Sequence, residues 1–328
     1  MSLTAIEPSR MYAREAPWIG IGAKGQWNHW QDALKAGALD FEVIAKEAKV
    51  EQTDYAMGSF MTHPTFYEVI PGVQVNVTHN AEQKILGCVS SQYGIIQNQD
   101  AFSLLQPILD EGAIITNAGM TEQGLCFMIA QWETTDILGE EWTYNIMCTN
   151  SFNSQFPCSL IIVPHRIICQ NMYRKVLANN DAMLHIRHMR LAPQRIEEAK
   201  FSTSKCLKYI EVFEDTIGQL ADGHMNTGDI QRLVELMFPF PPKHSERYKS
   251  TVLRVKQQRE DFVDNYLLVP NIKRWRDKPV GFLHAYYDYL SHRGQMRNMP
   301  GNWDHRRFSQ LVSGDAVKTN IIHEIKNL

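Results

Sequence analysis

Three polar side chains near the C-terminal end of the chain have the spacing of a metal-binding stripe. His284, Asp288 and His292 follow one another at intervals of four residues in the segment HAYYDYLSH. On a helix, residues four apart share a face, and imidazole and carboxylate groups are common ligands of transition metals. The face drifts by about 40° at each step, so a single ion does not easily contact all three groups. The stripe is a candidate metal centre, and the alternative, which we favour, is a row of structural hydrogen bonds.

Two shorter patterns of ligands or nucleophiles occur earlier in the chain. His185 and His188, in the sequence HIRH, meet the same geometric limit as candidate metal ligands. Cys169 and His165 are four residues apart in a segment of strand character, and that spacing separates them by about 13 Å. A catalytic Cys–His pair would therefore need a partner from elsewhere, and the patterns GxSxG, HExxH and HxE with PCxxC are absent. We assign no catalytic residue and no cofactor, and we favour a protein that is not an enzyme.

Basic residues alternate with aromatic residues in the second half of the chain. Lys and Arg side chains contact phosphates and aromatic rings stack on bases, a combination typical of sequence-tolerant binding to single strands. The interleaved rings are Tyr173, Tyr248, Trp275, Tyr286 and Tyr287. The predicted nucleic-acid surface comprises Arg166, Asn171, Arg174, Lys175, Arg187, Arg190, Lys249, Arg254, Lys273, Arg274 and Trp275, with Lys256 and Arg276 as further members. The alternative is that the rings belong to a helical core and that solvent surrounds the charges.

The formal net charge of −3 conceals an uneven distribution of charge along the chain. From Asp32 to Glu141, about 4 basic residues stand against about 16 acidic ones, whereas from Lys243 to Arg307 about 14 basic residues stand against about 7 acidic ones. Charge separated in this way can form a basic face for a polyanion although the total is near zero. The acidic half offers a second interpretation, in which it mimics a nucleic acid toward a host protein.

The elements that must position these residues are, in the first half of the chain, mainly strands. Apolar alternation and glycine-containing turns predict a largely antiparallel sheet over residues 66–169. One inserted helix is predicted to begin near Asn98 or Asp100 and to end at Gly112. The connections are too short for repeated crossover helices. The last predicted strand, residues 159–169, brings Arg166 to the junction with the second half.

After Asn171 the pattern becomes helical. Helices are predicted over residues 172–178, 187–220 with a break near Pro193, 229–238 after Thr227 as the cap, 246–266, 280–292, and from Ala316 onward. The run PFPP, residues 239–242, is a stiff stop. It marks a possible boundary near residues 239–243 within the helical half.

The composition is that of a globular protein. Hydrophobic residues make up 44% of the chain and charged residues 21%. The apolar runs are too short to span a bilayer, and the first 18 residues contain no apolar core of signal-peptide length. The six cysteines show no CxxC spacing and are expected to be reduced. We therefore expect a cytoplasmic protein that does not interact with a membrane.

Several sequence blocks, spread over nearly the full length, resemble a known family. They are APWIGIG, GALDFEV, LGCVSSQYGIIQNQDAF, ITNAGMTEQGLCFMIAQW, VPHRIICQNMYRKVL, IRHM and AYYDYLSHRG. In this order and at this spacing they are similar to the phage/plasmid-like family, a domain of unknown function. The resemblance implies a mobile-element protein in the cytoplasm of a host cell and supplies no reaction.

These observations predict an α+β protein. Residues 1–171 are expected to form an antiparallel sheet domain, and residues 172–328 a mainly helical region packed on it. We predict that the protein binds single-stranded nucleic acid, with strand annealing in recombination or replication as one role, and that it forms a homo-oligomer. The alternatives are a metal-dependent hydrolase or nuclease using His284, Asp288 and His292, and a non-enzymatic protein that binds a host defence or replication factor. The sequence does not distinguish DNA from RNA.

Overall fold

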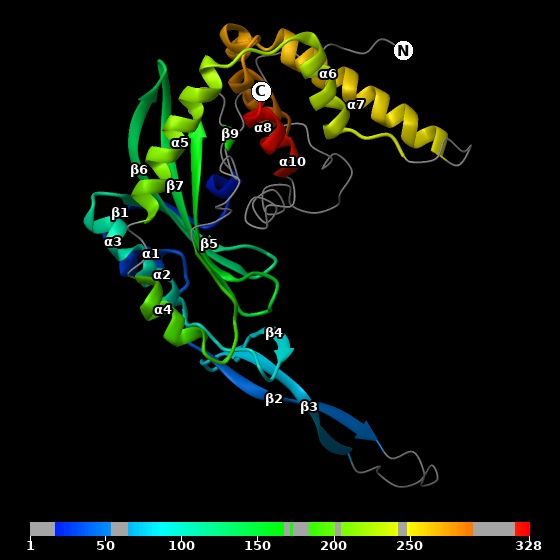
Figure 1. Cartoon of the computed structure of the whole chain (residues 1–328). Coiled ribbons are helices and arrows are strands. Elements are labelled where there is room, and N and C mark those ends of the chain that lie inside the picture. Colours follow the sequence, from blue (N-terminus) through cyan, green and yellow to red (C-terminus); the bar gives the residue numbers. More distant parts are fainter. Residues whose placement is uncertain are drawn as a thin grey trace.

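The computed structural model describes residues 17–53, 65–166, 171–172, 184–200, 205–241, 248–290 and 319–328. Within them the chain combines antiparallel sheets with helices that are concentrated in the C-terminal half, so the predicted α+β class is confirmed. Figure 1 shows a central sheet with helices along one side and above it, and a ribbon of strands that projects from the opposite end.

A seven-stranded antiparallel sheet forms the centre of the molecule. Its strands follow the order β1-β5-β6-β7-β8-β10, and β9 pairs with the other end of β8. The strands are β1 (Ala23–Trp27), β5 (Ile114–Met120), β6 (Leu125–Ile137), β7 (Glu140–Ser151), β8 (Cys158–Arg166), β9 (Asn171–Met172) and β10 (Leu184–Ile186). The longest strands, β6 and β7, pair from Leu125 opposite Ser151 to Ile137 opposite Glu140.

Both faces of this sheet are buried in its central strands. On β8, Leu160 and Ile162 belong to the main core, whereas Ile161 and Val163 belong to a smaller core on the opposite face that also contains Trp18. Successive strand residues point to opposite faces. A strand buried on both sides therefore reads as a continuous apolar run, as residues 160–163 do.

Helices cover the main core face. A first group consists of α1 (Trp30–Ala36), α2 (Asn98–Phe102), η3 (Ser103–Leu105), α3 (Gln106–Asp110) and α4 (Ala192–Lys200), of which α1 contacts β1 and β5, α2 contacts β7, and α4 contacts β10. The longer α5 (Lys205–Asp222) runs beside β6 and β7. The C-terminal group consists of α6 (Thr227–Met237), α7 (Lys249–Leu268), η6 (Pro270–Trp275), α8 (Pro279–Asp288) and α10 (Thr319–Lys326). A short turn of 3-10 helix, η2 (Pro17–Gly20), opens the described chain.

A second, three-stranded sheet has the order β2-β3-β4. Its strands are β2 (Val43–Thr53), β3 (Thr65–Thr78) and β4 (Ile85–Ser90). The strand β4 pairs only with residues 73–77 of β3, so the outer half of the β2–β3 pair is a two-stranded ribbon. This ribbon extends away from the rest of the molecule (Figure 1).

Several predicted elements differ from the structure. The helix predicted from residue 98 to Gly112 is three short segments, α2, η3 and α3, with Pro107 in the first turn of the last. Met172, predicted to begin a helix, instead forms β9 together with Asn171, because these two residues pair with His165 and Arg166 at the end of β8. Residues 173–178 lie outside the described part of the chain.

The long helix predicted over residues 187–220 is divided. Leu184–Ile186 pairs with β8 as strand β10, and the helices begin only at Ala192 and Lys205. The sheet thus takes one strand from the region predicted to be helical. No helix in the described residues is sufficiently long and apolar to cross a membrane.

Candidate functional site

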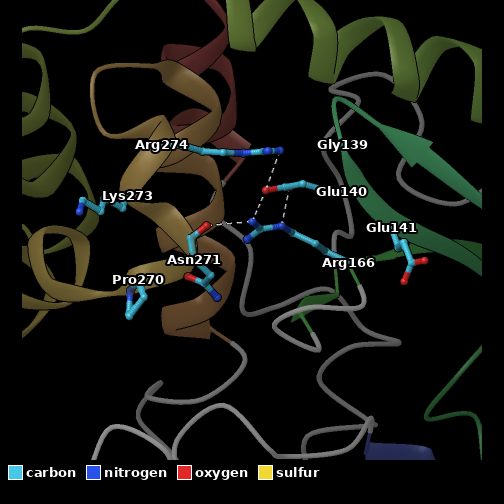
Figure 2. Close-up of a pocket in the computed structure, with 8 residues that line it drawn as sticks. All are labelled: Gly139, Glu140, Glu141, Arg166, Pro270, Asn271, Lys273 and Arg274. Atoms are coloured by element: carbon cyan, nitrogen blue, oxygen red, sulfur yellow. Dashed lines mark hydrogen bonds and ion pairs between the residues drawn. The ribbon is translucent and has the colours of Figure 1, made fainter.

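A cavity of about 760 Å³ lies where the ends of β7 and β8 meet η6. Its volume falls within the range of ligand-binding pockets. The lining residues are Gly139, Glu140, Glu141, Arg166, Pro270, Asn271, Lys273 and Arg274. Figure 2 shows that they come from two sides, the sheet with Glu140 and Arg166 and the helical segment with Arg274 and Lys273.

The turn between β6 and β7 places Glu140 at the wall of the cavity. Leu138 and Gly139 form the two-residue connection, with φ values of 58° and 76°. Positive φ at both positions is typical of the tight hairpin turn whose twist matches the flanking strands. The Asp136 carboxylate accepts a hydrogen bond of 2.8 Å from the Gly139 N–H. The carboxylate of Glu140 is thereby held at the start of β7, and its side chain is only 8% exposed.

Arg166, at the last position of β8, forms a two-point contact with Glu140. Its Nε donates to Oε2 at 2.7 Å and its terminal nitrogen donates to Oε1 at 2.5 Å. The same guanidinium donates to the Asn271 carbonyl oxygen at 2.9 Å. The sequence predicts Arg166 on an open basic surface, whereas in the structure the residue is buried, with 1% of its side chain exposed. The ion pair with Glu140 and the hydrogen bond to Asn271 therefore connect the sheet to η6. The charge of Arg166 is already balanced by Glu140.

Two neighbouring residues of η6 complete the contacts of Glu140. The Trp275 indole N–H donates to Oε1 at 3.0 Å, and the Arg274 guanidinium lies 3.2 Å from the same oxygen. Arg274 also donates to the Leu138 carbonyl oxygen at 2.6 Å and lies 4.4 Å from the centre of the Trp275 ring. That face of the indole, predicted to stack on bases, is therefore covered by the guanidinium.

His284, on α8, closes the buried side of this group. Its Nε2 lies 3.6 Å from Glu140 Oε2. Burial, and then the positive charges of Arg166 and Arg274, hold the pKa of His284 well below its usual range. The imidazole is thus neutral at neutral pH, and its contact with Glu140 is not an ion pair. We refer to Glu140, Arg166, Arg274, Trp275 and His284 as the Glu140 cluster.

The geometry around His284 does not suit a cation. Two guanidinium groups lie beside it, and Asp288, one turn later, accepts a hydrogen bond of 3.1 Å from Asn265 within the core. Among the described residues no three His, Cys, Asp or Glu side chains gather as a metal site. The third residue of the predicted stripe, His292, lies outside the described residues.

The open side of the cavity carries the groups that a ligand could reach. Lys273 is exposed and forms no hydrogen bond or ion pair within the described part of the chain, and the Arg274 side chain is 48% exposed. Asn271 also lines the cavity, and its Oδ1 is buried and has no hydrogen-bond partner within the described residues. Pro270 adds an apolar wall. The site thus offers cations, an amide and an apolar surface, a combination that fits an anionic ligand with a polar ring system.

The remaining predicted residues lie elsewhere. Arg187 and Arg190 are exposed just after β10, which pairs with the beginning of β8, roughly 25 Å along that strand from Arg166. Lys249, Arg254 and Lys256 are exposed on the first half of α7. For Asn171 the structure describes only the backbone, which pairs with that of Arg166. Arg174, Lys175, Tyr173 and Cys169 lie outside the described residues. The predicted set is therefore divided between two ends of the molecule.

The aromatic rings and histidines of the predicted patterns have structural partners. Tyr286 and Tyr287 are buried in the main core. His185 lies 2.7 Å from the Ser159 hydroxyl, and His188 stacks on Tyr93 with 4.7 Å between ring centres. Burial lowers the pKa of His188 to about 4.

Three of the cysteines, Cys126, Cys148 and Cys158, are buried free thiols on the core side of the sheet. Burial raises the pKa of Cys126 and of Cys158 to about 12, and that of Cys148 well above its ordinary value. A thiol is nucleophilic as the thiolate. These three side chains are therefore packing residues at neutral pH.

Comparison with known proteins gives a family for the chain. Residues 85–312, well over half of its length, match a family described as a domain of unknown function (DUF932). The chain belongs to the DUF932 family. The matched region of the DUF932 domain includes β4, the whole of the Glu140 cluster and the cavity. No curated protein and no solved structure matches the chain.

Proposed function

We propose that this DUF932 protein binds single-stranded nucleic acid without catalysing a reaction, and that Lys273 and Arg274 hold phosphates at the rim of the cavity. The observation that carries the proposal is the charge of the lining. The lining contains three cations, Arg166, Lys273 and Arg274, and two carboxylates, Glu140 and Glu141, and Glu140 is shared between the two arginines. An uncompensated positive charge therefore remains at the rim, centred on Lys273, where a phosphate contact releases counterions.

A single strand suits the cavity better than a duplex. Proteins recognise single strands through bases that are splayed out of the stack into pockets and hydrogen-bonded on their edges. The amide side chain of Asn271 and the apolar wall of Pro270 line the cavity and are suitable contacts for such a base. The helix α7, which leads into η6, adds the exposed cations Lys249, Arg254 and Lys256 within about 30 Å of helix. A bound strand would thus extend over several nucleotides from the cavity along α7.

The biological setting is part of the same proposal. We infer a phage or plasmid protein that acts in the cytoplasm of a host cell, and strand annealing in recombination or replication as its role. The support is the resemblance of ordered sequence blocks to the phage/plasmid-like family, together with the mixed sheet and basic helices. Mixing two complementary labelled oligonucleotides with the purified protein tests the annealing role. Acceleration of duplex formation would support the annealing role, and an unchanged rate would exclude it.

Charge reversal at the rim tests the binding function. Fluorescence anisotropy with a labelled single-stranded oligonucleotide should give a Kd for K273E/R274E at least about tenfold above that of the wild type. The matched control is K24E/K35E, which makes the same change of charge at exposed lysines of β1 and α1. Because Arg274 also contacts Glu140, K273E alone is measured as well. Equal affinities of K273E/R274E and the control, or no binding by the wild type, would exclude the proposal.

A further inference from the structure

The outer half of the β2–β3 ribbon is an unusual exposed surface. It consists of the pairs from Lys49 opposite Val69 to Thr53 opposite Thr65, and it projects from the molecule, with no third strand from the described residues on either edge (Figure 1). Tyr67 is 68% exposed, and Val50 and Val69 are each 43% exposed. An isolated two-stranded ribbon is marginally stable in water. Exposed apolar side chains on such a ribbon therefore indicate a surface that another chain covers.

The charges of the ribbon argue against nucleic acid as that partner. Its described charged side chains are Lys49, Glu51 and Glu68. Acidic residues thus outnumber basic ones. The described cations of the predicted nucleic-acid surface that are exposed lie instead on η6 and α7 and after β10.

The free edge of β2 is suited to pairing with a second copy of itself. A bend limits the regular part of this edge, because residues 70–73 of β3 lie opposite the single residue Ala48 of β2. Beyond the bend, the regular stretch is Lys49–Thr53. When two copies of one strand pair in antiparallel fashion about a two-fold axis, the residue at the axis lies opposite the same residue of the other copy. The residue before it then lies opposite the residue after it in the other copy.

Among the registers centred on Lys49, Val50 and Glu51, charge selects one. With Lys49 or Glu51 at the two-fold axis, like charges face each other, which is destabilising. With Val50 at the axis, Lys49 of each copy lies opposite Glu51 of the other, and the two half-exposed Val50 side chains pair. Within one strand, Lys49 Nζ lies 3.8 Å from Glu47 Oε2, and both side chains are exposed. An exposed ion pair contributes little to stability, so Lys49 can pair with Glu51 of the other copy instead.

We propose that the protein forms a two-fold dimer in which the β2 edges of two copies pair in antiparallel fashion with Val50 at the axis. The pairing joins two ribbons into a four-stranded sheet, a recurrent mode of association through exposed strand edges. On one of its faces, Tyr67, Glu51 and then Lys49 and Val69 of the second copy form a continuous row. This inference does not depend on nucleic-acid binding by η6, which lies on the opposite side of the molecule (Figure 1).

Charge exchange tests the register. Sedimentation equilibrium should show a dimer for the wild type, a loss of dimer for K49E and for E51K, and recovery of the dimer in K49E/E51K. K24E, a charge reversal on the distant β1, should dimerise as the wild type does. Thermal unfolding checks that each variant is folded. A wild type that is monomeric up to its solubility limit, or a dimer that K49E leaves unchanged, would overturn the proposal.

Cross-linking tests the position of the axis. In a background with Ser at the exposed Cys88, Val50→Cys should form a disulfide-linked dimer on mild oxidation, because opposed residues of antiparallel strands have Cα separations within the range of a disulfide. Ala45→Cys, also exposed on β2 but away from the axis, is the control. Equal cross-linking at the two positions would contradict the Val50 register.

Discussion

At the scale of the residue, Glu140 is the group on which the site depends. It accepts hydrogen bonds from Arg166 and Trp275 and contacts Arg274, and both it and Arg166 are buried. Removing one partner of a buried ion pair leaves the other charge without compensation, at a cost of about 3–5 kcal/mol. Glu140→Gln should lower the free energy of unfolding by that order, measured by urea denaturation.

The neighbouring residue supplies a control for this prediction. Glu141 is exposed, so that Glu141→Gln should leave the urea midpoint unchanged. The double variant Glu140→Leu/Arg166→Met, which removes both charges, should lose less stability than the sum of the two single changes. Equal midpoints for Glu140→Gln and Glu141→Gln would show that the buried pair does not contribute as described.

His188 makes a separate contribution to the dependence of stability on pH. Its pKa is about 4 in the folded chain, because of burial, against an ordinary value of about 6.5. Between these values the unfolded chain binds the additional proton, so the contribution is complete above pH 6.5 and is lost as the pH falls toward 4. His188→Phe, which retains a ring against Tyr93, should reduce the slope of unfolding free energy against pH by at most about 1.4 kcal/mol per unit in this window. An unchanged slope would contradict the assignment.

The sequence alone indicates some residues of the site but not the hydrogen bonds and ion pairs between them. Arg274, Trp275 and His284 were singled out by charge, ring type or spacing. Glu140 was not, because an acidic residue after a turn carries no distinctive pattern. The burial of Arg166 depends on contacts with Glu140 and Asn271, 26 and 105 residues away in the chain. Local patterns contain no information about such partners.

At the scale of the element, the position of η6 depends on a close approach to α8. A Cβ on Gly281 would lie 1.9 Å from the Trp275 carbonyl oxygen, a distance that backbone atoms cannot tolerate. Gly281→Ala should therefore displace η6 and lower both the melting temperature and the affinity for single strands. Gly218→Ala on α5 is the matched control, since nothing lies within 4 Å of its added Cβ and alanine favours a helix interior. A Gly281→Ala variant as stable as the wild type would exclude this packing.

The elements were predicted best where periodicity is strong. Strands β5 to β8 fall within residues 66–169, where the sheet was predicted, and helices α6 to α8 lie close to their predicted ranges, because the strands are apolar runs and the helices show a 3–4 residue repeat. The sheet predicted over residues 66–169 does not include β1, β2, β9 or β10. Of these, β1, β9 and β10 are short, and β10 forms because Leu184 and Ile186 pair with the edge of β8. Strand pairing of that kind is set by residues distant in sequence.

At the scale of the whole molecule, charge is distributed among separate ends. The cations of η6 and α7 lie on one side of the sheet, Arg187 and Arg190 lie at the far end of β8, and the mixed-charge ribbon of β2 and β3 extends beyond them (Figure 1). The sequence indicated an acidic first half and a basic second half. It did not indicate that the basic residues divide into two groups, since this depends on which end of β8 each segment joins.

The proposed binding of nucleic acid is tested most directly by its dependence on salt. Each phosphate contact made by a cation adds about 1 to the slope of log Kd against log salt concentration. The affinity of the wild type for a single strand should therefore fall steeply with salt, and K273Q should reduce the slope by about 1, whereas K24Q on β1 should leave it unchanged. An affinity independent of salt, or the same slope for K273Q and the wild type, would contradict phosphate binding at the rim of the cavity.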